Sequence, residues 1–160
     1  MRVPVYLSHQ ASAHADLKQF DDARRRLDEA MTAMETSGER WCEADILRMA
    51  GEIELMSPER DAAKAQTWFE RAIEAARAQQ ARSWELRATT SLARLVRDQG
   101  RREEAHGLLA PVYGWFTEGF DTLDLREAKA LLEGIATRGS DSAGPKYALS
   151  KALRLGHRST

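Results

Sequence analysis

Arginine side chains recur at helical spacing within residues 83–99 and are the groups of this chain best suited to bind a ligand. Arg87, Arg94 and Arg97 stand at positions i, i+7 and i+10, which predicts a basic strip along one side of a helix. A guanidinium group can grip a carboxylate through two hydrogen bonds, so such a strip would hold an acidic peptide or a chain terminus. The alternative is an ordinary solvated face, on which Arg94 pairs with Asp98 four residues later.

Residue patterns for catalysis or metal binding do not occur in the sequence. The histidines are scattered, and His9 and His14 lie five residues apart, about 140° around a helix, so they do not share a face. Phe120 stands where the lysine of a phosphate-binding loop would be. Cys42 has no histidine near it in sequence, which favours a buried small hydrophobe over a nucleophile. The sequence therefore predicts a protein that is not an enzyme and uses no cofactor or metal.

The composition predicts that helices position these side chains, in an all-α fold. Ala, Leu, Glu, Arg and Lys make up half of the 160 residues, against four valines and four isoleucines. Good helix formers thus dominate and strand formers are scarce. Apolar residues recur at helical spacing and predict helices near 4–17, 20–36, 39–56, 60–80, 83–99, 102–117 and 121–137.

Breakers and capping residues separate the predicted helices. Gly38 and Gly100 each follow a predicted helix, as glycine commonly does. Ser57 followed by Pro58 predicts a helix N-cap and the first helical residue, because proline lacks an amide that would be unpaired there anyway. Asp121 predicts the N-cap of the last helix.

A small–large–small trio recurs in every second predicted helix, at intervals of 42 and 40 residues. This spacing predicts a tandem repeat of helix pairs, which stack into a right-handed helical solenoid because no pair can cover its own apolar face. The helix at 39–56 has two apolar faces, as a helix between two neighbours needs. The trios are Ala23, Leu27 and Ala30; Ala65, Phe69 and Ala72; and Ala105, Leu109 and Val112.

The trio resembles the second helix of the tetratricopeptide repeat. The runs at 41–44, 51–53, 83–88 and 113–121 are similar to the C-terminal repeat region of bacterial adenylate/guanylate cyclases and related signalling ATPases, and this resemblance covers roughly residues 3–137. It implies a tetratricopeptide-like (TPR-like) solenoid of about three helix pairs plus a closing helix, spanning residues 1–138.

The resemblance also implies a concave groove lined by the first helix of each pair. A peptide would bind there through the basic strip. The alternative is again a solvated face, because Glu52 can neutralise its basic neighbours. The residues expected to line this peptide-binding groove are Arg48, Arg87, Thr90, Arg94 and Arg97.

The two ends of the chain differ from its middle. Val3, Val5, Tyr6 and Leu7 form an apolar start with no polar capping helix before it, which predicts a fragment, a partner at that end, or self-association through the N-terminal helix. The alternative is that this end simply frays. Residues 139–160 begin with Gly and Ser and carry four Lys and Arg side chains against the single acid Asp141, which predicts a flexible basic tail.

The charge balance limits the classes of partner. A formal net charge of -1, with both signs mixed along the chain, disfavours nucleic acid and anionic membranes as partners. The longest apolar stretch, near 108–116, is too short to span a bilayer, and a single cysteine favours a cytoplasmic location.

Two functions are consistent with this sequence. The first is a non-catalytic scaffold for protein binding in signal transduction, which takes a protein or acidic peptide in its groove. The alternative is a detached or truncated regulatory C-terminal part of a nucleotide cyclase or signalling ATPase.

Overall fold

The computed structural model describes residues 3–141, which contain seven α-helices and one short 3-10 helix joined by short connections. Those residues contain no β-strand, so the predicted all-α fold is confirmed. The predicted basic tail lies outside the described residues except for its first three positions, which continue the last helix. The helices are α1 (Val3–Asp16), α2 (Phe20–Ser37), η1 (Arg40–Cys42), α3 (Glu43–Met56), α4 (Ala62–Ala78), α5 (Arg82–Asp98), α6 (Arg102–Tyr113) and α7 (Leu123–Asp141).

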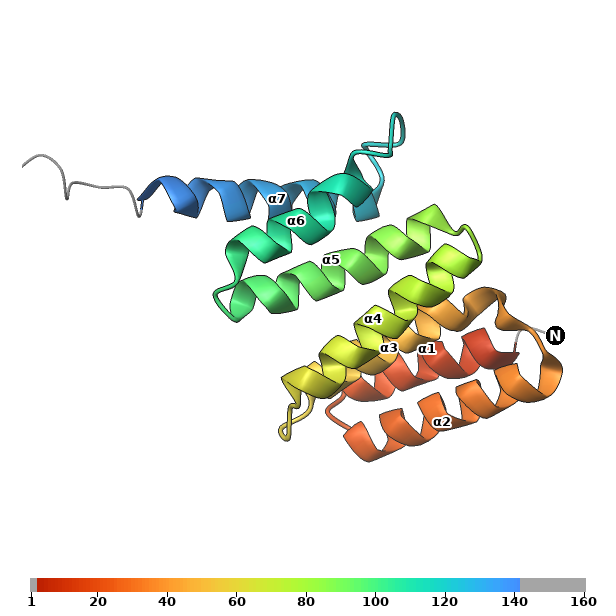
Figure 1. The fold of residues 1–160 in the computed structure, drawn as a ribbon. Coiled ribbons are helices and arrows are strands. Elements are labelled where there is room, and N and C mark those ends of the chain that lie inside the picture. The colour runs from red at the N-terminus through yellow and green to blue at the C-terminus, as the bar shows by residue number, and fades with distance from the viewer. Residues whose placement is uncertain (1–2, 142–160) are drawn as a thin grey trace, which may run out of the picture.

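Successive helices lie side by side along the molecule (Figure 1). Each helix contacts the next one in sequence, and the odd-numbered helices also contact one another: α1 with α3, α3 with α5, and α5 with α7. The helices α3, α5 and α7 therefore form a continuous row, and side chains far apart in the sequence meet along it.

The predicted small–large–small trios form the centre of the packing. All nine of their side chains are buried, in α2, α4 and α6. The helix α3 contributes to two apolar clusters, with Leu47 in one and Ile46 and Ile53 in the other. The helix therefore has an apolar face toward each cluster, as predicted, but Trp41 and Met56, which were expected on these faces, are 47% and 40% exposed.

The predicted break between α3 and α4 is correct, but its capping residue is not Ser57. The backbone N–H of Ser57 donates to the carbonyl of Ile53 at 3.1 Å, so Ser57 closes the last turn of α3. The N-cap of α4 is Asp61, whose carboxylate accepts a hydrogen bond from the backbone N–H of Lys64 at 3.0 Å. The prediction placed the N-cap too early because Ser-Pro and Asp are both helix-start signals, and only Asp61 reaches the amides of α4.

The helix α6 ends at Tyr113, earlier than the predicted 117. Pro111 lies inside it and supplies no backbone N–H. Beyond it, Trp115 and Phe116 donate to carbonyls only three residues back, at 3.3 and 3.2 Å, and this tightening ends the helix. The next helix, α7, begins at Leu123, where the carbonyl of Thr122 accepts its first bond, so Asp121 precedes the cap.

Cys42 is buried at the end of η1, as predicted for a small hydrophobe. Burial raises the pKa of its thiol, chiefly by desolvation. We expect the native thiol to react with Ellman's reagent at pH 8 at least about tenfold more slowly than the urea-unfolded chain, because the thiolate is the reactive form. Equal rates would contradict the burial.

The same shift has a consequence for stability. Because the folded-state pKa of Cys42 lies above that of the unfolded chain, folding favours the protonated thiol. This contribution to the free energy of unfolding is complete below the unfolded-state pKa. It is lost as pH rises through the folded-state pKa. A Cys42→Ala variant, which has no thiol, is expected to lose less stability over that alkaline range.

Candidate protein-interaction site

Four of the five predicted groove residues line one hollow on the row formed by α3, α5 and α7. Arg48 comes from α3, and Arg87, Thr90 and Arg94 come from α5. The hollow has a volume of about 210 Å³. The other residues that line it are Glu52, Ser91, Leu123, Asp124 and Glu127.

Arg97 does not join this hollow. It lines a separate one with Gly100 and Arg102, and its Nη2 lies 2.7 Å from Oδ1 of the neighbouring Asp98. Helical geometry explains the difference, because seven residues return to within about 20° of the starting direction while ten residues end about 80° away. The helical repeat therefore directs Arg97 to a different side of α5 from Arg87 and Arg94.

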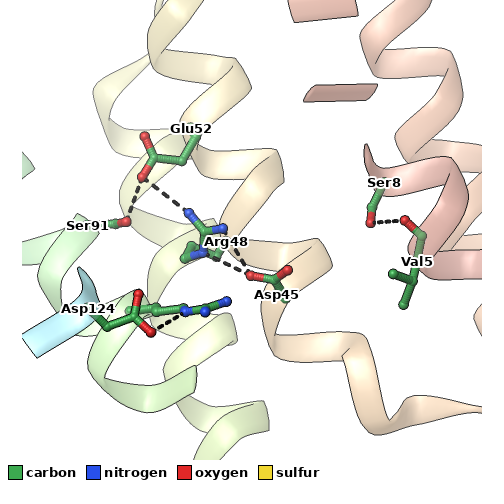
Figure 2. Close-up of polar contacts among 8 residues, drawn as sticks. Val5, Ser8, Asp45, Arg48, Glu52, Ser91 and Asp124 are labelled. Atoms are coloured by element: carbon green, nitrogen blue, oxygen red, sulfur yellow. Dashed lines mark hydrogen bonds and ion pairs between the residues drawn. The ribbon is translucent and has the colours of Figure 1, made fainter. Parts of the chain in front are cut away.

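On the α3 side, Arg48 is held by two acids of its own helix. It donates to Oδ1 of Asp45 from Nε at 3.1 Å and from Nη2 at 3.0 Å, and its Nη1 lies 3.8 Å from Oε1 of Glu52 (Figure 2). The same Glu52 oxygen accepts a hydrogen bond from the hydroxyl of Ser91 at 2.6 Å. This contact ties α3 to α5 across a separation of 39 residues.

On the α5 side, Arg87 and Arg94 contact acids of α7. The Nε of Arg87 donates to Oδ2 of Asp124 at 2.8 Å, and Nη2 of Arg94 lies 3.8 Å from Oε2 of Glu127. The hydrogen bond to Asp124 raises the pKa of Arg87 despite partial burial, and the charges of Asp45 and Glu127 act in the same direction. The predicted pair between Arg94 and Asp98 does not form.

Thr90 lies at the hollow but is buried. Its hydroxyl donates to the carbonyl of Leu86, one turn earlier in α5, at 2.7 Å. Threonine in a helix commonly makes this bond, which uses the hydroxyl proton within the helix. Thr90 therefore shapes the wall of the hollow, and its proton is not free for a ligand.

The predicted basic strip is a network of alternating charge. Three arginines and three acids line the hollow, so their formal charges cancel. The sequence prediction included Glu52 but missed Asp124 and Glu127. The repeat gave no signal for Asp124: extending the 39-residue interval between Arg48 and Arg87 by one unit reaches Arg126, which lies two residues beyond Asp124 and about 200° away around a helix.

The predicted apolar start of the chain is exposed in part. Val3 is 41% and Tyr6 is 65% exposed. Val3 and Pro4 line a larger hollow, of about 660 Å³, together with residues of α2 that include Thr32 and Ala33. Self-association through this end stays a prediction.

Within residues 3–141, no helix combines the length and the apolar character needed to cross a membrane. In that same part of the chain, no three or more His, Cys, Asp or Glu side chains come together in a way that would hold a metal ion.

Comparison with known proteins identifies no relative. No protein-family model matches the chain, and neither does any curated protein or solved structure.

Proposed function

We propose that this chain is a non-catalytic protein-interaction module with the architecture of a TPR-like right-handed solenoid, working in the cytoplasm. The repeating buried trios and the row of odd-numbered helices support this architecture. Its function is to bind a carboxylate-bearing segment of a partner protein in the hollow between α3, α5 and α7. The catalytic part of a nucleotide cyclase or signalling ATPase is one partner to test, given the resemblance stated above.

The observation that carries the proposal is the pairing of the groove arginines with carboxylates. Arg48 and Arg87 each donate from Nε to a carboxylate oxygen at 3.1 Å or less, and both guanidinium groups lie at the wall of an open hollow. These side chains are already oriented to bind carboxylates, so an acidic ligand needs little rearrangement of them. Because the lining charges cancel, long-range attraction is weak, and affinity depends on short-range hydrogen bonds.

Binding of a fluorescein-labelled hexaglutamate peptide, followed by fluorescence anisotropy with the full chain, tests this function. We expect the wild-type chain to bind hexaglutamate and not hexalysine. The Arg87→Ala/Arg94→Ala variant is expected to bind at least about tenfold more weakly, because it loses charge-assisted hydrogen bonds and leaves Asp124 and Glu127 to repel the peptide.

The matched control is Arg60→Ala/Arg101→Ala, which removes the same charge from connecting segments outside α3, α5 and α7. It is expected to change the affinity less than twofold. If the control loses as much affinity as the groove variant, or if the wild-type chain does not bind hexaglutamate, the proposed function is wrong.

A further inference from the structure

The acids of α7 occupy the positions that an acidic ligand would take on α5. Asp124 accepts the Nε hydrogen bond of Arg87, and Glu127 lies 3.8 Å from Arg94. We infer that α7 acts as an internal competitor, and that the partner is an acidic helix whose carboxylates replace these two on the α5 arginines. This inference rests on the proposed function and adds the form and the regulation of its ligand.

The position of α7 is set by apolar packing, which is independent of these ion pairs. Leu125, Ala128, Leu131 and Ile135 are buried in the same cluster as the core of α5 and α6. Asp124 and Glu127 lie among them in sequence and are partly exposed, at 26% and 50% of their side-chain surface. The packing therefore holds the α7 backbone beside the arginines, whereas solvent reaches the two carboxylates. A partner helix that approaches from the solvent side offers its own carboxylates to the arginines when the side chains of Asp124 and Glu127 rotate away.

The spacing of the two acids specifies the partner. Asp124 and Glu127 are three residues apart on a helix, so they lie on neighbouring turns of one face. Arg87 and Arg94 are two turns apart on α5 and converge on them through long side chains. A partner helix with carboxylates at i and i+3 would offer the same two acceptors as α7 does.

The contacts also indicate how strongly α7 competes. The Arg87–Asp124 contact is a charge-assisted hydrogen bond of 2.8 Å to a carboxylate that is 26% exposed, whereas the Arg94–Glu127 contact is 3.8 Å long and its carboxylate is 50% exposed. Asp124 is thus the stronger competitor. Replacing both acids by their amides would also change the formal lining charge from zero to +2, which favours an acidic ligand.

The test compares Asp124→Asn/Glu127→Gln with Glu70→Gln/Glu133→Gln, a control that removes the same charge from exposed positions away from the hollow. Two fluorescein-labelled probes are titrated into each full chain by anisotropy. One is hexaglutamate, and the other is an alanine-rich helical peptide with glutamates at i and i+3. We expect the α7 variant to bind the helical peptide about tenfold more tightly than wild type, and the control to change less than threefold. Thermal unfolding by circular dichroism checks that both variants are folded.

The possible outcomes separate this inference from the proposed function. Wild-type binding that depends on Arg87 but does not improve in the α7 variant overturns the competitor and leaves the proposed function standing. A gain equal to that of the control has the same meaning, because net charge alone would explain it. Tighter binding of hexaglutamate than of the helical peptide overturns the helical form of the partner. Failure of both probes to bind wild type and the α7 variant overturns both proposals.

Discussion

Replacing Phe69 by alanine is expected to lower the free energy of unfolding by about 3–5 kcal/mol, the usual cost of removing a buried aromatic ring. Phe69 is 0% exposed and is the largest fully buried side chain of the described residues. It is the large member of the central trio on α4 and belongs to the apolar cluster that extends from α3 to α7. The cavity left by the ring would lie within this cluster, to which α3, α4, α5, α6 and α7 all contribute buried side chains. Urea unfolding followed by circular dichroism measures the change.

The matched control is Phe120→Ala, which removes the same ring from a site that is 46% exposed. Phe120 lies in the connection between α6 and α7, where the centroid of its ring is 6.0 Å from that of Tyr113. We expect a loss below about 1 kcal/mol there, because little apolar surface is removed from a packed site. Losses of equal size at the two positions would contradict the central role assigned to Phe69.

Helical periodicity predicted most of this fold because the buried residues of each helix recur at helical spacing, and α2, α4 and α6 each carry one trio on the buried face. The seven predicted helices all exist, and all nine trio residues are buried. The errors lie at helix ends. A helix begins where a capping side chain lies close enough to accept a hydrogen bond from the free amides, as Asp61 does and Ser57 does not. A pattern of residue types does not give the distance between a side chain and those amides.

The candidate site was predictable only to the extent that its residues share one helix or one repeat position. Arg87 and Arg94 are seven residues apart, and the helical repeat alone places them on one side of α5. Their partners Asp124 and Glu127 come from α7, whose contact with α5 depends on how the helices stack. Periodicity within a helix carries no information on that contact, so the sequence indicated the basic half of the network and missed most of the acidic half.

Both the core and the site depend on close approach between neighbouring helices. Between α3 and α4, a substitution of Gly51 tests how close that approach is. A Cβ atom built on Gly51 would lie 2.5 Å from Cε1 and 2.8 Å from Cδ1 of Phe69. Non-bonded carbon atoms normally stay about 3.5–4.0 Å apart, near the optimum of their attraction. The Phe69 ring is enclosed on all sides and cannot move away without disturbing the core.

Gly51→Ala is therefore expected to lower the free energy of unfolding by about 1–3 kcal/mol through overpacking. This change is opposite in sign to the usual effect, since alanine stabilises a helix by about 1 kcal/mol relative to glycine. The matched control is Gly107→Ala in α6, where a Cβ atom would have no neighbour within 4 Å. Urea unfolding is expected to show a gain of about 0.5–1 kcal/mol at that position.

A double variant separates overpacking from other causes. Phe69→Leu removes ring atoms that Gly51→Ala would meet, so the two substitutions together are expected to cost at least about 1 kcal/mol less than the sum of their separate costs. Additive costs would mean that the methyl group added at position 51 disturbs something other than the ring. The helix α3 contacts both α4 and α5, so a shift of α3 that relieves the clash would disturb the hydrogen bond between Glu52 and Ser91. Hexaglutamate binding by Gly51→Ala is accordingly expected to weaken more than binding by Gly107→Ala.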